Sequence, residues 1–162
     1  MEIGTNSLGE IEELSHIVKP DHIIITDVSI GHIEGLKSLD NIVEEKASIC
    51  SGQKQKGTAI IPSGIEKFSQ LKAKVEAFGP NLISVGEDEV SDVRISDTEV
   101  LNNAITSKIL DLEQNLWNIS LKTTGKHYMK NAAALLALVF SLKLNPSKAV
   151  SYTHLRAHET EL

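Results

Sequence analysis

Hydrophobic residues in the first half of the chain follow two alternating spacings. Three segments repeat apolar residues every three or four positions, which places them on one face of a helix; they lie near residues 8–18, 41–51 and 66–78. Between them are short runs of β-branched and other apolar residues, typical of buried strands, near residues 22–28, 57–62 and 81–86. Helices alternating with short buried strands predict an α/β fold with a mostly parallel, doubly wound sheet.

The pattern changes between Val90 and Thr124. Apolar and polar residues alternate there over short segments such as Leu116–Leu121, which predicts a small antiparallel addition to one side of the sheet. A last, alanine-rich helix is expected near residues 128–144. In the helix near residues 66–78, the apolar side chains, including Phe78, are expected to face the core.

Composition and charge exclude several classes of function. A net charge of −6 and only six Phe, Trp and Tyr residues argue against a nucleic-acid surface. The longest apolar stretch, residues 132–144, is shorter than the ~20 residues that a membrane span needs, so it is interpreted as a buried helix. A single cysteine, Cys50, cannot form an internal disulfide, and no signal peptide precedes the first helix, so a cytoplasmic protein is expected.

Four short motifs carry the candidate chemistry. They are Glu2-Ile3-Gly4-Thr5-Asn6, Ile30-Gly31-His32-Ile33-Glu34-Gly35, Glu45-Lys46-Ala47 and Gly125-Lys126-His127-Tyr128-Met129-Lys130-Asn131. The first three lie beside predicted strand ends or on the following helix, and a parallel sheet collects ligands at the carboxyl edge of its strands. We therefore expect Glu2, His32 and Lys46 to converge at that edge. A carboxylate suits Mg²⁺, and an imidazole suits a second metal position beside it.

Each of these residues also has an ordinary structural interpretation when it is taken alone. Glu2 could be an exposed acid, His32 a loop residue bonded to backbone, and Lys46 part of a solvated helix face. His127 could cap a helix or lie on the surface, and Asn131 could bond to backbone near a helix start. Their order and spacing together favour a site.

The four motifs resemble those of the Mur ligase family, in its central ATP-binding domain, over roughly residues 1–149. Within the family they are most similar to the branch that adds D-alanyl-D-alanine to UDP-N-acetylmuramoyl-tripeptide in peptidoglycan synthesis. The resemblance implies an ATP-dependent amide-bond ligase that works through an acyl phosphate and uses ATP and Mg²⁺. It implies metal ligands at Glu2, His32 and Lys46, with Lys46 carbamylated, and nucleotide contacts at His127 and Asn131.

Three positions depart from the family pattern and leave alternatives open. Asp27 stands where asparagine is usual, Ser48 replaces an acid after Lys46, and Tyr128 replaces the first asparagine of the last motif. A related ligase such as folylpolyglutamate synthetase shares the central fold and a similar metal site. A non-catalytic nucleotide-binding module would explain the departures as degeneration.

The two ends of the sequence suggest a fragment. Nucleotide hydrolysis of this type needs a Gly-Lys-(Ser/Thr) phosphate loop, and the sequence has no such triplet, so the loop is expected upstream. We expect residues 1–149 to form a partial central domain that is inactive by itself. Residues 150–162 are interpreted as a non-native tail, because Ser151–Thr160 resembles a translated sequencing adaptor of the transposase type.

Overall fold

The structure is a computed structural model that describes residues 2–5, 7–29, 36–54 and 57–145. It divides into two compact units, Met1–Leu82 and Ile83–Leu162, so the boundary falls inside a strand, β3 (Asn81–Gly86). The predicted tail lies outside the described residues. No helix within the described ranges is both long enough and apolar enough to cross a membrane.

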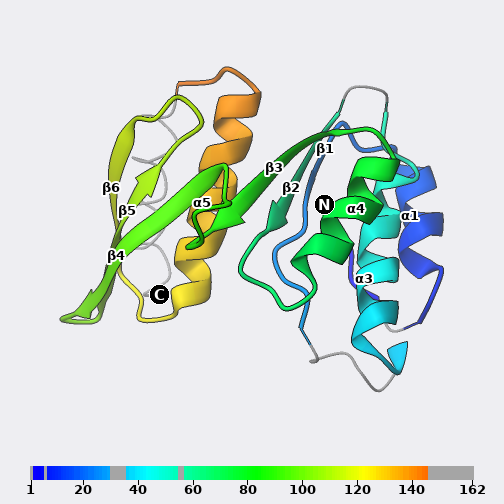
Figure 1. Cartoon of the computed structure of the whole chain (residues 1–162), viewed down its shortest axis with the longest axis horizontal. Helices are drawn as coiled ribbons and strands as arrows, with labels where there is room; N and C mark the ends of the chain where they lie inside the picture. Colours follow the sequence, from blue (N-terminus) through cyan, green and yellow to red (C-terminus); the bar gives the residue numbers. More distant parts are fainter. Residues whose placement is uncertain (1, 6, 30–35, 55–56, 146–162) are drawn as a thin grey trace, which may run out of the picture. The chain divides into compact units, whose positions relative to one another are not determined.

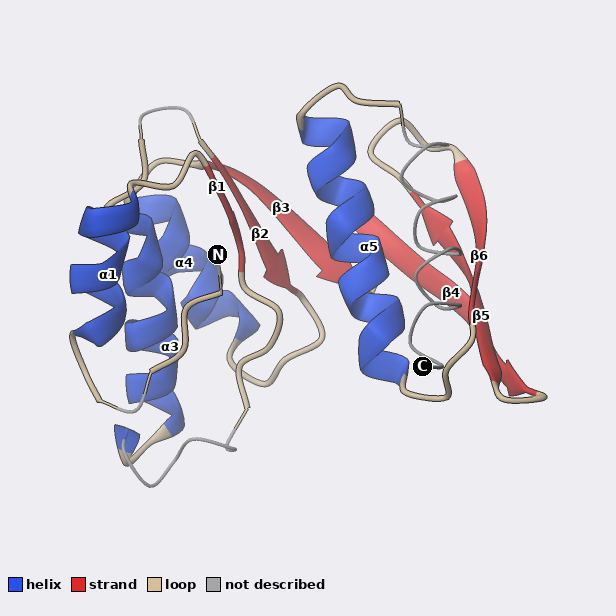
Figure 2. Cartoon of the chain, turned by 180° about the vertical axis from the view of Figure 1, so that it is seen from behind, coloured by secondary structure: helices blue, strands red, loops and turns tan. Residues whose placement is uncertain are grey.

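The first unit contains helices beside short parallel strands (Figures 1 and 2). Its elements are α1 (Glu10–Val18), β1 (His22–Ile24), α3 (Leu39–Ala47), a 3-10 turn (Ser48–Cys50), β2 (Thr58–Pro62) and α4 (Phe68–Ala77), followed by the start of β3. Strands β1 and β2 pair in parallel, His22 opposite Thr58 and Ile24 opposite Ile60. The α/β fold and the alternation predicted for this half are confirmed.

The core of the first unit is formed by strand β2 and the inner faces of α3 and α4. All five residues of β2 are buried, as expected for a parallel strand covered on both faces. Ile42 and Val43 of α3 and Leu71 and Val75 of α4 are fully buried against it. The prediction for Phe78 was wrong: α4 ends at Ala77, and the Phe78 side chain is 49% exposed just past the last turn.

The second unit joins a mixed sheet to the last helix. Strand β3 pairs in parallel with β4 (Val93–Leu101), and β5 (Ala104–Leu110) and β6 (Leu116–Leu121) add antiparallel strands. Asn102 and Asn103 form the two-residue β4–β5 turn with φ of 51° and 59°, a left-handed conformation that asparagine tolerates. Helix α5 (Lys126–Ser141) packs on β4 and β5. The predicted antiparallel strands and final helix are therefore confirmed.

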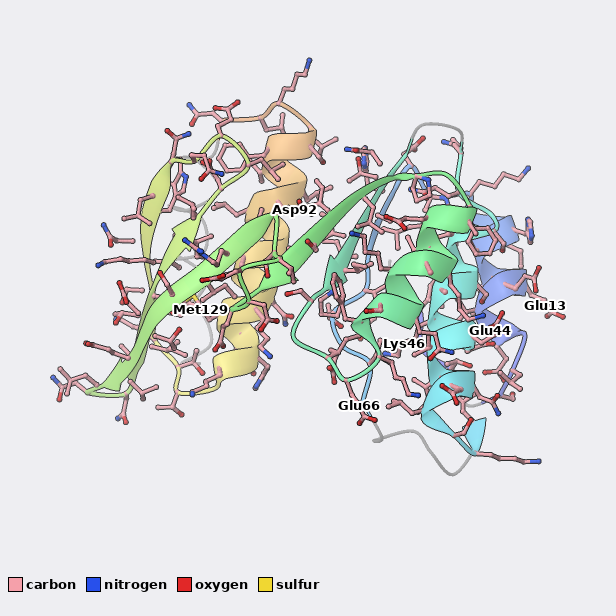
Figure 3. All side chains as sticks on the ribbon, viewed as in Figure 1. Glu13, Glu44, Lys46, Glu66, Asp92 and Met129 are labelled. Carbon is pink, nitrogen blue, oxygen red and sulfur yellow. The ribbon has the colours of Figure 1, made fainter. Side chains whose placement is uncertain are left out.

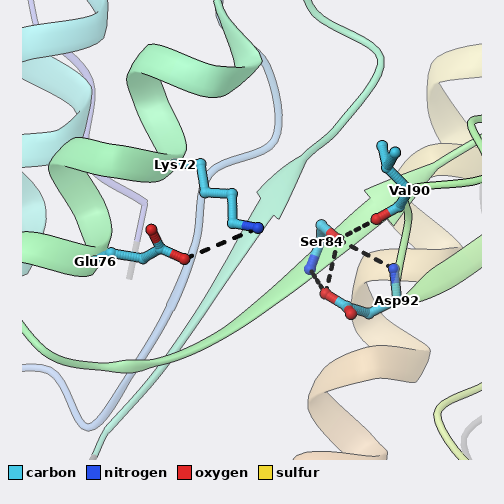
Figure 4. A network of polar contacts seen from close by, with 5 residues as sticks. All are labelled: Lys72, Glu76, Ser84, Val90 and Asp92. Atoms are coloured by element: carbon cyan, nitrogen blue, oxygen red, sulfur yellow. Dashed lines mark hydrogen bonds and ion pairs between the residues drawn. The ribbon is translucent and has the colours of Figure 1, made fainter.

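A short connection links the parallel strands β3 and β4. Parallel neighbours usually need a crossover of a dozen residues or more, but only residues 87–92 separate these two. Figure 4 shows the hydrogen bonds between Ser84 of β3 and Asp92, the last residue of this connection. The Asp92 carboxylate accepts from the Ser84 amide at 2.8 Å and from the Ser84 hydroxyl at 2.7 Å. The Asp92 amide donates a hydrogen bond of 3.0 Å to the Ser84 hydroxyl oxygen.

Candidate functional site

The carboxyl ends of β1 and β2 lie at the same edge because the two strands are parallel and in register. The pairing continues one residue past β1, where the Ile25 amide donates to the Ile60 carbonyl at 2.9 Å. Strand β1 is shorter than the predicted segment 22–28, so residues 26–29 form a loop at this edge. Open α/β sheets bind ligands at such an edge.

Lys46 reaches this edge from the last turn of α3 (Figure 3). Its Nζ donates a hydrogen bond of 2.6 Å to the backbone carbonyl of Asp27, three residues beyond β1. The contact uses the main chain of Asp27, so the replacement of the family's asparagine by aspartate leaves this hydrogen bond intact. The Lys46 amine therefore lies beside the loop that follows β1.

Burial lowers the pKa of the Lys46 amine below its ordinary value, and the negative charge of Asp27 opposes part of that shift. The lysine is half-buried, so its ammonium loses part of its hydration while the aspartate still favours the charged form. A lowered pKa increases the fraction of neutral amine near neutral pH. Only a neutral amine can add CO₂, so the environment of Lys46 suits carbamylation.

Glu2 lies on an N-terminal segment that is bound to α3. The Glu2 side chain is exposed. Three residues later, the Thr5 hydroxyl lies 3.3 Å from a carboxylate oxygen of Glu45, the residue next to Lys46. The Gly9 amide donates to the other Glu45 oxygen at 2.7 Å. The segment that carries Glu2 is therefore held beside the helix that carries Lys46.

Glu45 was not among the residues predicted from the sequence. It is only 2% exposed, whereas Glu44 is exposed and pairs with Lys74. A signal was available, because Glu45 follows the buried Ile42 by three positions and so shares its helix face.

His32 lies outside the described residues, so its predicted convergence with Glu2 and Lys46 stays a prediction. Within the described part of the chain, no three His, Cys, Asp or Glu side chains are grouped closely enough to hold a metal ion. The available donors are nevertheless compatible with a divalent cation. Glu2 supplies a carboxylate, and a carbamate on Lys46 would supply further oxygen atoms, the ligands that Mg²⁺ prefers.

His127 and Asn131 belong to α5, in the second unit. Both are exposed and lie four positions apart, so they share a face in the first turns of the helix. The ring of His127 packs on that of Tyr128, with centroids 4.1 Å apart. Gly125, which precedes the helix, lies close to this pair: a Cβ there would come within 2.7 Å of the His127 ring.

The chain belongs to the Mur ligase family: residues 1–139 match the Mur ligase middle domain. A curated relative, the UDP-N-acetylmuramoyl-tripeptide–D-alanyl-D-alanine ligase of Buchnera aphidicola, is 31% identical over 144 residues. That alignment covers 89% of this chain and 31% of the relative. The chain thus spans about a third of the length of the curated relatives it matches.

Solved structures share the fold. The crystal structure of MurF from Acinetobacter baumannii superposes with a TM-score of 0.85 at 24% identity, over 95% of this chain and 33% of that one. MurF from Thermotoga maritima, in complex with ADP, gives a TM-score of 0.75 at 20% identity, over 86% and 32% of the two chains. The apo form of L. casei FPGS gives 0.70 at 16% identity, over 86% and 34%.

Proposed function

We propose that the chain is part of an ATP-dependent ligase that adds D-alanyl-D-alanine to UDP-N-acetylmuramoyl-tripeptide. The Buchnera aphidicola relative bears this activity in its name, and a MurF structure of the same fold contains ADP. The proposed substrates of the whole protein are ATP, the uridine-nucleotide tripeptide and D-alanyl-D-alanine. Such a reaction takes place in the cytoplasm, where the nucleotides are available.

The chemistry proceeds in two stages. ATP transfers its γ-phosphoryl group to the tripeptide carboxylate and leaves as ADP. The amine of D-alanyl-D-alanine then attacks the acyl phosphate, which forms the amide bond and releases inorganic phosphate and a proton. A divalent cation bound at the carboxyl edge would neutralise charge on the phosphates during transfer. The residues proposed to hold it are Glu2, His32 and a carbamylated Lys46. On α5, His127 and Asn131 are the proposed nucleotide contacts, and the ring of Tyr128 packs on that of His127.

The observation that carries the proposal is the position of the Lys46 amine. A lysine on a solvated helix face would extend into water, whereas this amine is half-buried and donates to the Asp27 carbonyl at the strand edge. An ammonium at that place would repel a metal ion. A carbamate there would attract one, and burial favours the neutral amine from which it forms.

Carbon-13 NMR of the chain in labelled bicarbonate, with and without Mg²⁺, tests this proposal. We expect a carbamate carbonyl signal that increases with Mg²⁺ and disappears in Lys46→Arg. Lys54→Arg is the matched control, because Lys54 is an exposed lysine of the same unit that pairs with Asp21 at 3.0 Å. The control should retain the signal. A signal that survives Lys46→Arg, or is absent from the unmodified chain, would contradict the proposal.

Replacing Asp27 provides a second test, because it should change the pKa of Lys46 in a known direction. Its negative charge raises the pKa of Lys46, so Asp27→Asn should lower that pKa further while keeping the carbonyl contact. The carbamate fraction at a fixed pH below the lysine pKa should then increase. A decrease would mean that the Asp27 charge does not act on the amine as proposed.

A further inference from the structure

The carboxylate of Glu45 is buried against a segment distant in sequence. Its Oε2 accepts a hydrogen bond of 2.7 Å from the Gly9 amide. Its Oε1 accepts one of 2.8 Å from the Ile11 amide and lies 3.3 Å from the Thr5 hydroxyl. All three contacts are with residues 5–11, more than 30 positions before Glu45 in the chain. Both carboxylate oxygens are therefore occupied within the protein.

Glu45 caps α1 from another helix. The first amides of a helix have no partners within it and carry the positive end of its dipole. The N-cap residue of α1 is Gly9, which has no side chain to bond them and has φ of 93°. Since a buried carboxylate is costly unless it is hydrogen-bonded, these contacts stabilise both the helix start and the buried charge.

Two consecutive residues of α3 thus contact two different segments. Neighbouring side chains on a helix point about 100° apart. Glu45 is directed to residues 5–11, and Lys46 is directed to Asp27, beyond β1. Glu2 is only three residues from Thr5, and a chain spans at most about 3.5 Å per residue, so its Cα lies within about 11 Å of that of Thr5. Two of the three proposed ligands, Glu2 and Lys46, therefore belong to segments that Glu45 joins.

We infer that Glu45 is a positioning residue of the proposed metal site, which holds the segment carrying Glu2 against the helix carrying Lys46. This inference rests on the proposed function. We assign Glu45 a positioning role and not metal ligation, because its carboxylate is buried and accepts from the Gly9 and Ile11 amides. Residues that orient metal ligands typically change metal affinity 10- to 100-fold when they are replaced.

The test measures Mn²⁺ affinity, as a substitute for Mg²⁺, by electron paramagnetic resonance in bicarbonate buffer. In Glu45→Gln, the new amide group faces a backbone N–H and cannot accept its hydrogen bond, so we expect Mn²⁺ affinity to fall at least about tenfold. Glu44→Gln controls for the lost charge, because Glu44 is exposed on the same helix and contacts Lys74 instead. Its Mn²⁺ affinity should remain within about twofold of the unmodified chain.

A second control separates positioning from general stability. Ser38→Ala removes the N-cap of α3, where the Ser38 hydroxyl accepts from the Asn41 amide at 3.1 Å. It should lower the thermal unfolding midpoint without weakening Mn²⁺ binding at a temperature where every variant is folded. If Ser38→Ala weakens Mn²⁺ binding as much as Glu45→Gln does, the role of Glu45 is only structural and the inference is wrong.

The remaining outcomes distinguish the inference from the proposed function. If Glu2→Gln and Lys46→Ala abolish Mn²⁺ binding while Glu45→Gln retains it, the inference fails and the proposed site stands. If neither ligand variant changes Mn²⁺ binding, the proposed site fails and the inference with it. Should Glu45→Gln not fold, Glu45→Asp retains the charge on a shorter side chain, and unchanged Mn²⁺ affinity in that variant would overturn the inference.

Discussion

Asp111→Asn is expected to destabilise the second unit strongly. Asp111 is completely buried at the end of β5. Its Oδ1 accepts hydrogen bonds from the Glu113 amide at 2.8 Å and the Asn115 amide at 2.9 Å, and its Oδ2 accepts one from the Trp117 indole at 2.6 Å. Asparagine has the same shape but places an NH₂ group against the indole N–H or against the two amides.

The size of this effect follows from the hydrogen bonds lost. A hydrogen bond to a charged acceptor contributes about 1.5–3 kcal/mol, and an unsatisfied donor adds a desolvation penalty. We expect a loss of about 3 kcal/mol, which lowers the thermal midpoint by about 6–12 °C in a chain of this size. Trp117 is the only tryptophan, so its fluorescence reports unfolding at this site directly.

The effect should also depend on pH. Burial alone would raise the pKa of Asp111, but hydrogen bonds from Trp117, Asn115 and Glu113 outweigh it, and the pKa is lowered. A lowered folded pKa stabilises the protein above the unfolded value of about 4, and that stabilisation is lost as the pH falls through the folded pKa. The difference in thermal unfolding midpoint between the unmodified chain and Asp111→Asn should therefore become smaller below about pH 4.

Asp97→Asn is the matched control for this prediction. Asp97 lies on β4, pairs with Lys108 at 2.8 Å and is exposed. Its φ of 51° suits asparagine as well as aspartate, so the unfolding midpoint should hardly change. A shift in Asp111→Asn no larger than that of Asp97→Asn would refute the reasoning.

Three further predictions concern the first unit. In Gly52→Ala, the added Cβ would lie 2.3 Å from backbone atoms of Ser15, so urea unfolding should show a loss of more than about 2 kcal/mol; a neutral result would mean that the loop moves freely. Leu71→Ala removes a fully buried side chain and should cost about 2–5 kcal/mol in the same assay, whereas a smaller loss would indicate that α4 collapses into the space. Cys50 is buried and its pKa is raised to about 12, so iodoacetamide at pH 8 should modify it only after unfolding; rapid native labelling would contradict its burial.

Strand pairing in the second unit was only partly predictable. The alternation between Val90 and Thr124 predicted antiparallel strands, and β4, β5 and β6 pair in that way. The parallel pairing of β3 with β4 was not predicted, because periodicity shows which residues are buried and does not show strand direction. The bonds between Ser84 and Asp92, eight positions apart, accompany that pairing.

The candidate site was likewise only partly predictable from the sequence. Order and spacing of the motifs led us to expect Lys46 at the carboxyl edge of an α/β sheet, because parallel strands end at one edge. In the structure its amine contacts the Asp27 carbonyl, in the loop after β1. The motifs did not single out Glu45, although its spacing from Ile42 places it on the buried face of α3. What its carboxylate contacts could not be predicted, because residues 5–11 are distant in sequence.

The sequence by itself determined the α/β class, the order of helices and strands and the family, because local periodicity and short motifs are properties of neighbouring residues. The tertiary structure decided which groups the buried Glu45 carboxylate contacts, that the Lys46 amine donates to a main-chain carbonyl, and that burial lowers the pKa of that amine. These properties depend on desolvation and hydrogen bonds between segments 19 to 40 positions apart, which only folding brings into contact.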